Sequence, residues 1–147
     1  MKGVHLLDVN VLVALFDPDH VHHQLAHDWF ADHRTDGWAT CPLTEMGFVR
    51  VVSRPNYGSP LARPADLLPL LRRFCAGREH HFWTGAISLR DGAIFTPALV
   101  QGHRQLADIY LLGLAVTMKG RLVTFDRTIP VSAVKGARPE SLTVIGD

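Results

Sequence analysis

The sequence predicts an α/β fold in which helices pack on a mainly parallel β-sheet. Short apolar segments rich in branched residues alternate along the chain with longer segments whose apolar residues recur at helical spacing. The 147 residues, of which 47% are hydrophobic and 20% are charged, match the usual size of one domain, without internal repeats or a long linker. We therefore expect one domain that spans residues 1–147.

The N-terminal half is expected to contain two strands and three helices. The first strand, Gly3–Leu7, ends at Asp8, and Asn10 is expected to cap a short helix over Val11–Phe16. The Asp17-Pro18-Asp19 segment ends this helix. The next elements are an amphipathic helix over His22–His33, a strand over Trp38–Thr40 and a helix over Leu43–Ser53 with Pro42 at its first position.

The C-terminal half continues this alternation. A loop over 54–63 precedes a helix over 64–76, in which Pro69 conflicts with the helical pattern unless it kinks the helix or lies in its first turn. A helix is expected over Gln105–Lys119, and Gly120 follows it where a left-handed cap belongs. No element is predicted for 84–102. Further strands are expected at His81–Trp83, Leu122–Phe125 and Leu142–Ile145.

Composition excludes several classes of protein. The 15 basic and 14 acidic side chains leave a net charge of +1, so a nucleic-acid partner must be held by a local patch. The two cysteines, Cys41 and Cys75, lie far apart in no metal-ligand spacing, which fits a reducing cytosol. The longest near-apolar stretch, Ile109–Met118, is too short to span a bilayer, and Asp8 and Asn10 interrupt the apolar core of a signal peptide. We expect a cytoplasmic protein.

Two of the predicted strands end in an aspartate, Asp8 and Asp126. Ligands of open α/β sheets bind outside the carboxyl ends of the strands, although a single aspartate there often only caps the following segment. The helix from Asp108 to Met118 rises about 15 Å. The strand from Arg121 to Asp126 returns about 16 Å in the opposite direction. Asp108 and Asp126 are therefore expected at the same edge of the sheet.

Glu45 is expected at this edge as well, in the first turn of the helix that follows a strand, although a helix N-terminus favours an acidic residue in any case. Carboxylates that share a pocket repel one another and raise each other's pKa values, so such a cluster is explained if divalent cations occupy it. Oxygen ligands alone suit Mg²⁺ or Mn²⁺. Two such ions about 4 Å apart promote phosphodiester hydrolysis. The predicted catalytic and metal-binding residues are Asp8, Glu45, Asp108 and Asp126.

Two polar residues lie next to these acids in the sequence. Asn10 and Thr124 stand two residues from Asp8 and Asp126. Each is a candidate for holding a metal-bound water or fixing a carboxylate rotamer. The alternatives are that Asn10 is only a helix cap and Thr124 only a strand residue.

Four segments resemble, in order, the acidic motifs of PIN domains, and more narrowly those of the VapC toxins of type II toxin–antitoxin systems. They are LLDVNVLVALF with Asp8, TEMGFVRVVS with Glu45, LADIYLLGLAV with Asp108 and RLVTFDR with Asp126. The resemblance implies a three-layer α/β/α PIN-like domain with about five strands, acting as a Mg²⁺- or Mn²⁺-dependent endoribonuclease. It also implies inhibition by a VapB-like antitoxin and homodimerisation. The bulky Ile109-Tyr110 pair departs from many relatives, which carry smaller residues there.

Four arginines near the acidic positions are candidates for binding RNA phosphates, with ordinary surface charge or ion pairing as the alternative. They are Arg50, Arg54, Arg104 and Arg127. His23 and His27 have a spacing that can bind zinc, but a solvated helix face is the favoured interpretation. The leucine-rich helix from Pro64 and the Trp29-Phe30 face either belong to the core or present a groove to an antitoxin helix.

Three other functions are alternatives to a metal-dependent ribonuclease. One alternative is a non-catalytic RNA-binding PIN-like module, although such modules usually lose one or more acids. A haloacid-dehalogenase-like phosphatase requires a second aspartate where this chain has Asn10. A phospho-receiver requires an acidic pair after the first strand and a lysine after a late one, and neither is evident.

Overall fold

A five-stranded sheet forms the centre of the computed structural model, which describes residues 3–58 and 63–146. The strands are β1 (His5–Leu7), β2 (Trp38–Thr40), β3 (His80–Phe82), β4 (Arg121–Thr124) and β5 (Leu142–Val144). They lie in the order β3-β2-β1-β4-β5, and every neighbouring pair is parallel. The expected α/β fold with a mainly parallel sheet of about five strands is confirmed.

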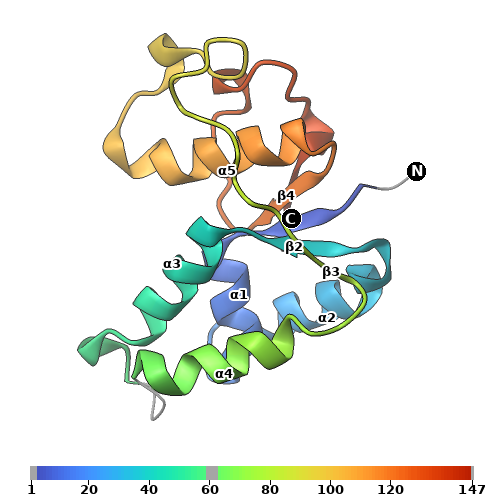
Figure 1. The fold of residues 1–147 in the computed structure, drawn as a ribbon, viewed down its shortest axis with the longest axis vertical. Coiled ribbons are helices and arrows are strands. Elements are labelled where there is room, and N and C mark those ends of the chain that lie inside the picture. The colour runs from blue at the N-terminus through green and yellow to red at the C-terminus, as the bar shows by residue number, and fades with distance from the viewer. Residues whose placement is uncertain (1–2, 59–62, 147) are drawn as a thin grey trace.

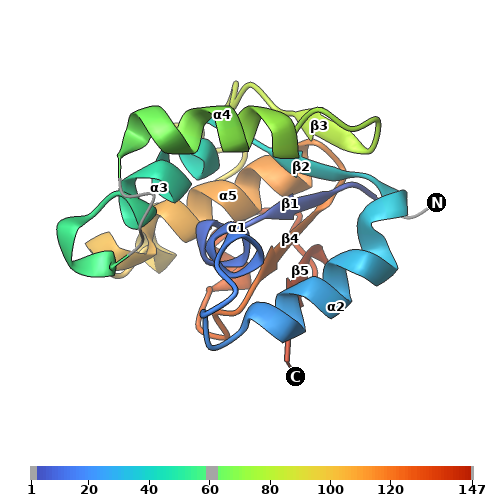
Figure 2. The same cartoon turned by 90° about the horizontal axis from the view of Figure 1, so that it is seen from below.

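Helices cover both faces of this sheet. They are α1 (Val9–Phe16), α2 (His23–His33), α3 (Pro42–Val52), α4 (Pro64–Phe74) and α5 (Leu106–Thr117). Figure 1 shows α1 to α4 on one face and α5 on the other, which gives the three layers that the resemblance implied. Figure 2, seen from the four-helix face, shows α1 between α2 and α3. Within the described ranges, no helix is both long and apolar enough to cross a membrane.

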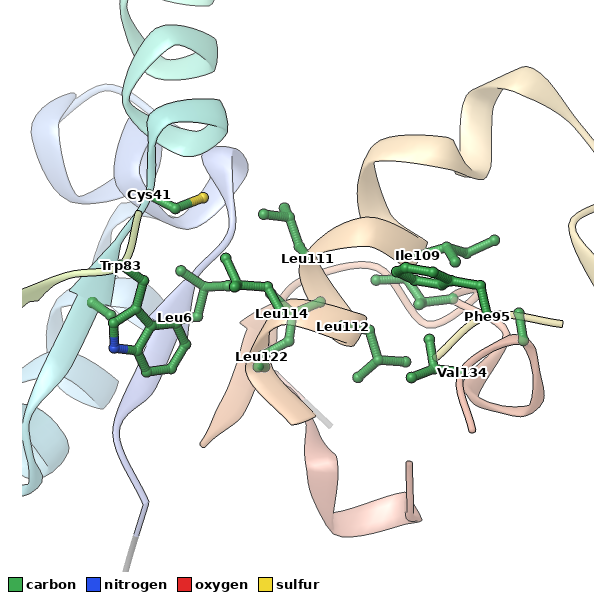
Figure 3. Close-up of a cluster of buried hydrophobic side chains, with 14 residues drawn as sticks. Leu6, Cys41, Trp83, Phe95, Ile109, Leu111, Leu112, Leu114, Leu122 and Val134 are labelled. Carbon is green, nitrogen blue, oxygen red and sulfur yellow. The ribbon is translucent and has the colours of Figure 1, made fainter. Parts of the chain in front are cut away.

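Neighbouring residues of the central strands face opposite layers, as the pleat of a strand requires. In β1, Leu6 packs in the cluster around α5 (Figure 3), whereas Leu7 packs on the side of α1. Leu122 and Val123 of β4 divide in the same way. All four are fully buried, and burial of such a side chain contributes about 1.5–3 kcal/mol. Packing from both sides therefore holds the central strands, and with them the carboxyl edge where β1 and β4 end.

The segment 84–102, for which no element was predicted, is mostly irregular and packs against α5. Phe95 is buried there, and a Cβ atom on Gly113 would lie 2.5 Å from its ring. The hydroxyl of Tyr110 donates a hydrogen bond to the carbonyl oxygen of Gly85 at 2.8 Å. Side-chain contacts and backbone hydrogen bonds around an isolated bridge between Phe95 and Val134 together order this segment.

Two predicted helix caps were wrong. Asp8 caps α1, because its side chain accepts a hydrogen bond from the backbone of Val9, whereas Asn10 lies inside the first turn. At the end of α5, Lys119 takes the left-handed conformation (φ 58°) that was expected of Gly120. The other predicted boundaries differ by at most two residues from those observed, and α4 continues through Pro69.

Candidate active site

Asp8 lies at the carboxyl end of β1, in the middle of the sheet, and only 5% of its surface is exposed. The backbone N–H of Val9 donates to Oδ1 at 2.7 Å, and the hydroxyl of Thr124 donates to Oδ2 at 2.7 Å. Burial raises the pKa of Asp8, and the charge of Asp126 raises it further, while the two hydrogen bonds oppose the shift. The two hydrogen bonds therefore fix both carboxylate oxygens of Asp8, and burial disfavours the ionised form of this group.

Asp126 follows β4, the strand next to β1, and a short hydrogen-bonded turn holds it. Thr128 donates to Asp126 Oδ1 from its backbone N–H at 2.8 Å and from its hydroxyl at 2.6 Å. The backbone N–H of Asp126 donates to the hydroxyl oxygen of Thr124 at 3.0 Å. The buried Thr124 therefore connects Asp8 to the backbone of Asp126, which is the carboxylate-fixing contact considered from the sequence.

Asp108 lies in the first turn of α5 and is partly buried. Burial raises the pKa of Asp108 to about 7, and the negative charges of Asp8 and Asp126 add to this shift. The three aspartates therefore lie close enough to repel one another, although they come from β1, α5 and β4. The expectation that α5 and β4 return Asp108 and Asp126 to one edge agrees with this interaction.

Glu45 has different partners in this structure. It lies in the first turn of α3, and its Oε2 accepts a hydrogen bond from the hydroxyl of Thr40 at 2.7 Å. Its charge acts on Cys75 and His80, which belong to the end of α4 and to β3. The structure therefore brings three of the four predicted carboxylates together, and the participation of Glu45 in their metal site stays a prediction.

The remaining candidates lie on the surface. Asn10 is exposed in the first turn of α1, and its proposed role beside a metal ion stays a prediction. The four arginines are also exposed, and Arg127 donates to the carbonyl oxygen of Gly146 at 3.4 Å. His23 binds the carbonyl oxygen of Ala14 at 2.6 Å, and its ring centroid lies 5.0 Å from that of His27.

Sequence reasoning missed one cluster of potential ligands. The cluster consists of Glu45, Cys75 and His80, whose potential ligand atoms all lie within 4.8 Å of one another. Within the described residues, it is the one such group of three or more His, Cys, Asp or Glu side chains. Neither Cys75 nor His80 was predicted from the sequence as a metal ligand. Since three separate elements supply its members, no local spacing of residues in the sequence predicts this cluster.

The three aspartates fit a hard divalent cation. Their donors are all oxygen atoms, and burial, with a further contribution from the neighbouring negative charges, raises the pKa values of Asp8 and Asp108. A divalent cation relieves that repulsion, and oxygen-only ligands favour Mg²⁺ or Mn²⁺ over zinc or copper. The arrangement is therefore suited to binding a metal ion at the edge where α/β sheets hold their ligands.

Comparison with known proteins identifies the family of this chain. Residues 5–134 match the model of the PIN domain family. The chain belongs to the PIN domain family. This PIN-domain chain is 44% identical over 140 residues to Ribonuclease VapC44 of Mycobacterium tuberculosis. The matched stretch covers 95% of this chain and 98% of the relative. The chain is 40% identical over 131 residues to Ribonuclease VapC39 of the same organism, covering 89% and 94%.

The fold of this PIN-domain protein is also found in a solved structure, that of VapBC2 from Rickettsia felis bound to a DNA fragment from their promoter. The two chains superpose with a TM-score of 0.55 at 12% identity, over 96% of each chain. This likeness concerns the fold alone.

Proposed function

We propose that this PIN-domain protein is a cytoplasmic, metal-dependent endoribonuclease, the toxin of a VapBC-type toxin–antitoxin system, folded as a single domain over residues 1–147. The observation that carries the proposal is the electrostatic interaction among Asp8, Asp108 and Asp126, of which Asp8 and Asp126 follow the adjacent strands β1 and β4. The high identity to relatives named ribonucleases over nearly the whole chain supports the same activity.

The chain's own residues prepare the site for hydrolysis of a phosphodiester bond. When bound, Mg²⁺ or Mn²⁺ supplies the positive charge that admits a phosphate to this acidic edge and that activates a water molecule. Asp8, Asp108 and Asp126 offer carboxylate oxygens to it, and Thr124 keeps Asp8 in one rotamer. Glu45 joins them as a fourth acid when its carboxylate turns away from Thr40.

Exposed arginines near the acidic motifs in the sequence are the proposed contacts for RNA phosphates. Arg50 and Glu45 line the same hollow of about 380 Å³ between α3 and α4. Arg54, Arg104 and Arg127 are exposed at other points close in sequence to the acidic motifs. Their guanidinium groups are suited to paired hydrogen bonds with phosphate oxygens.

The decisive experiment uses the purified protein, free of antitoxin, with RNA. We expect cleavage with Mg²⁺ or Mn²⁺, none in excess EDTA, and a loss of about 100-fold or more in Asp8→Asn and Asp108→Asn. Asp32→Asn is the matched control, because Asp32 is an exposed acid on α2. Undiminished cleavage by both site variants would overturn the proposal, and RNA binding without cleavage by the parent would favour the non-catalytic alternative.

An apolar groove of about 440 Å³ between α1, α2 and α4 is the proposed docking site for the antitoxin. Phe30, Leu70 and Phe74 line it, whereas Trp29 stacks on His33 instead. Arg34 and Arg73 also border the groove. We infer that its occupant is an amphipathic segment with apolar residues toward the groove and acidic residues at the rim.

A second hollow, of about 470 Å³, is the proposed contact between two copies of the chain. It lies between α3, the start of α5 and the segment after β3. Met46, Leu89 and Leu106 line it, and 56%, 43% and 40% of their respective surfaces are exposed. Exposed large apolar side chains gathered around one hollow are typical of a protein interface.

A further inference from the structure

The cluster of Glu45, Cys75 and His80 differs from the three aspartates in its hydrogen-bond partners and in the types of its donor atoms. Glu45 comes from the first turn of α3, Cys75 ends α4, and His80 begins β3. One potential ligand atom from each side chain lies within 4.8 Å of the other two, and all three residues are partly buried. Three elements far apart in the sequence therefore bring an oxygen, a sulfur and a nitrogen donor together.

The hydroxyl of Thr40 marks the point on which these donors converge. It lies 2.7 Å from Glu45 Oε2 and 2.8 Å from His80 Nε2, and it also interacts with the thiol of Cys75. Thr40 is fully buried at the end of β2. Since the register of β2 and β3 fixes His80 opposite Trp38, sheet pairing rather than a mobile loop holds the nitrogen donor.

The ring of His80 is oriented for ligation. It packs against the indole of Trp38, with 4.7 Å between the ring centroids. Nε2 of the same ring contacts the hydroxyl of Thr40 at 2.8 Å. Contacts of this kind hold the ring of a metal-binding histidine in one orientation.

We propose that Glu45, Cys75 and His80 form a binding site for a divalent cation of the zinc class. Thiolate and imidazole donors select Zn²⁺ or Co²⁺ rather than Mg²⁺. Zinc takes sulfur at about 2.3 Å and nitrogen or oxygen at about 2.0–2.2 Å. These lengths place ligand atoms about 4 Å or less apart, so the side chains close inward by about 1 Å or less. Of the three ligands, Glu45 also lines the hollow beside α3.

Occupation of this site withdraws Glu45 from the aspartates, a consequence that rests on the proposed function. The Glu45 carboxylate already points to Thr40 and His80 in the metal-free chain, and a zinc-class ion holds it there. Micromolar zinc is then expected to slow RNA cleavage in Mg²⁺, and Cys75→Ser to relieve this inhibition. Binding of the metal ion itself can be measured without any nuclease activity.

The binding test is a titration of the full-length, metal-free protein with Co²⁺, followed by absorption spectroscopy. A thiolate-to-cobalt charge-transfer band is expected, which Zn²⁺ abolishes at equimolar concentration and a large excess of Mg²⁺ does not. Cys75→Ser removes the band, and His80→Gln weakens Co²⁺ affinity by about tenfold or more. Matched controls are Cys41→Ser, which changes the only other cysteine, and His81→Gln, which changes the exposed neighbouring histidine.

The outcomes separate this site from the aspartate site. Asp108→Asn is expected to keep the cobalt–thiolate band even though it removes the proposed nuclease activity. Absence of any thiolate band in the parent, or a band that Cys41→Ser removes, overturns the proposal. Equal Co²⁺ affinity in His80→Gln and His81→Gln also contradicts it, and circular dichroism verifies that each variant is folded.

Discussion

Burial raises the pKa of Asp108 to about 7, and the negative charges of Asp8 and Asp126 contribute to this shift. In the unfolded chain the pKa returns to about 3.8, its ordinary value. Between about pH 4 and pH 7 the folded state therefore binds more protons than the unfolded state. The free energy of unfolding must then fall as pH rises through this window.

The corresponding variant is Asp108→Asn, which has no charge to crowd. In excess EDTA we expect its unfolding temperature to exceed that of the parent, with an advantage that grows from pH 5 to pH 8. Adding Mg²⁺ should stabilise the parent more than the variant, since only the parent keeps the full set of carboxylates. A metal-free parent that is more stable than Asp108→Asn at pH 8 would contradict a crowded acidic site.

Residues also show where sequence reasoning reaches its limit. Asp108 and Asp126 were placed together from helix rise and strand rise alone, because backbone geometry sets where an element begins and ends. The partners of Glu45 depend instead on a side-chain rotamer and on Thr40, Cys75 and His80 from other elements. Such contacts depend on tertiary packing, which cannot be predicted from the spacing of residues within the α3 segment.

At the scale of elements, the turn between α5 and β4 determines how Asp108 and Asp126 face one another. The helix ends with the N–H of Gly120 bound to the carbonyl of Ala115 and the N–H of Lys119 bound to that of Val116. Lys119 therefore occupies the left-handed position. Gly120 is required for another reason, because a Cβ there would lie 2.3 Å from the carbonyl oxygen of Val4 in the chain entering β1.

These two positions should respond in opposite ways to substitution. Lys119→Gly relieves the left-handed strain and is expected to stabilise the protein by about 1 kcal/mol or less. Gly120→Ala forces the turn away from the chain entering β1 and is expected to destabilise it by about 2–3 kcal/mol. Chemical denaturation of the metal-free protein measures both. Equal stability of Gly120→Ala and the parent would show that the turn is not closely packed.

Other elements differed from expectation for identifiable reasons. The apolar spacing of α4 outweighs Pro69, since the proline removes one backbone donor while the helix continues. The segment 84–102 has no periodic pattern because its order comes from side chains such as Phe95 and from contact with α5. The central strands β1 and β4 were predicted closely, since a strand buried between two helical layers is a largely apolar run.

The apolar groove shares no lining residue with the aspartate site or with the proposed dimer contact, although these two both use the start of α5. The three aspartates lie at the carboxyl edge of the sheet, the apolar groove lies between α1, α2 and α4, and the proposed dimer contact lies between α3 and α5. A substitution in the groove should therefore affect antitoxin binding without altering the catalytic edge. Helix α4 tests this separation, because Leu70 lines the groove while Leu68 lines the hollow on its α3 side.

We expect Leu70→Asp to weaken binding of the antitoxin by about tenfold or more, because it places a charge in the apolar contact. The antitoxin to test is the VapB-type product of the adjacent reading frame, with affinity measured by calorimetry. Leu68→Asp is the matched control, since it makes the same change on the same helix at a side chain that is 55% exposed. Arg73→Glu changes only the charge at the rim and should also weaken binding, so that the test survives if Leu70→Asp unfolds. If Leu68→Asp weakens binding as strongly as the two groove variants do, the antitoxin docks elsewhere on the molecule.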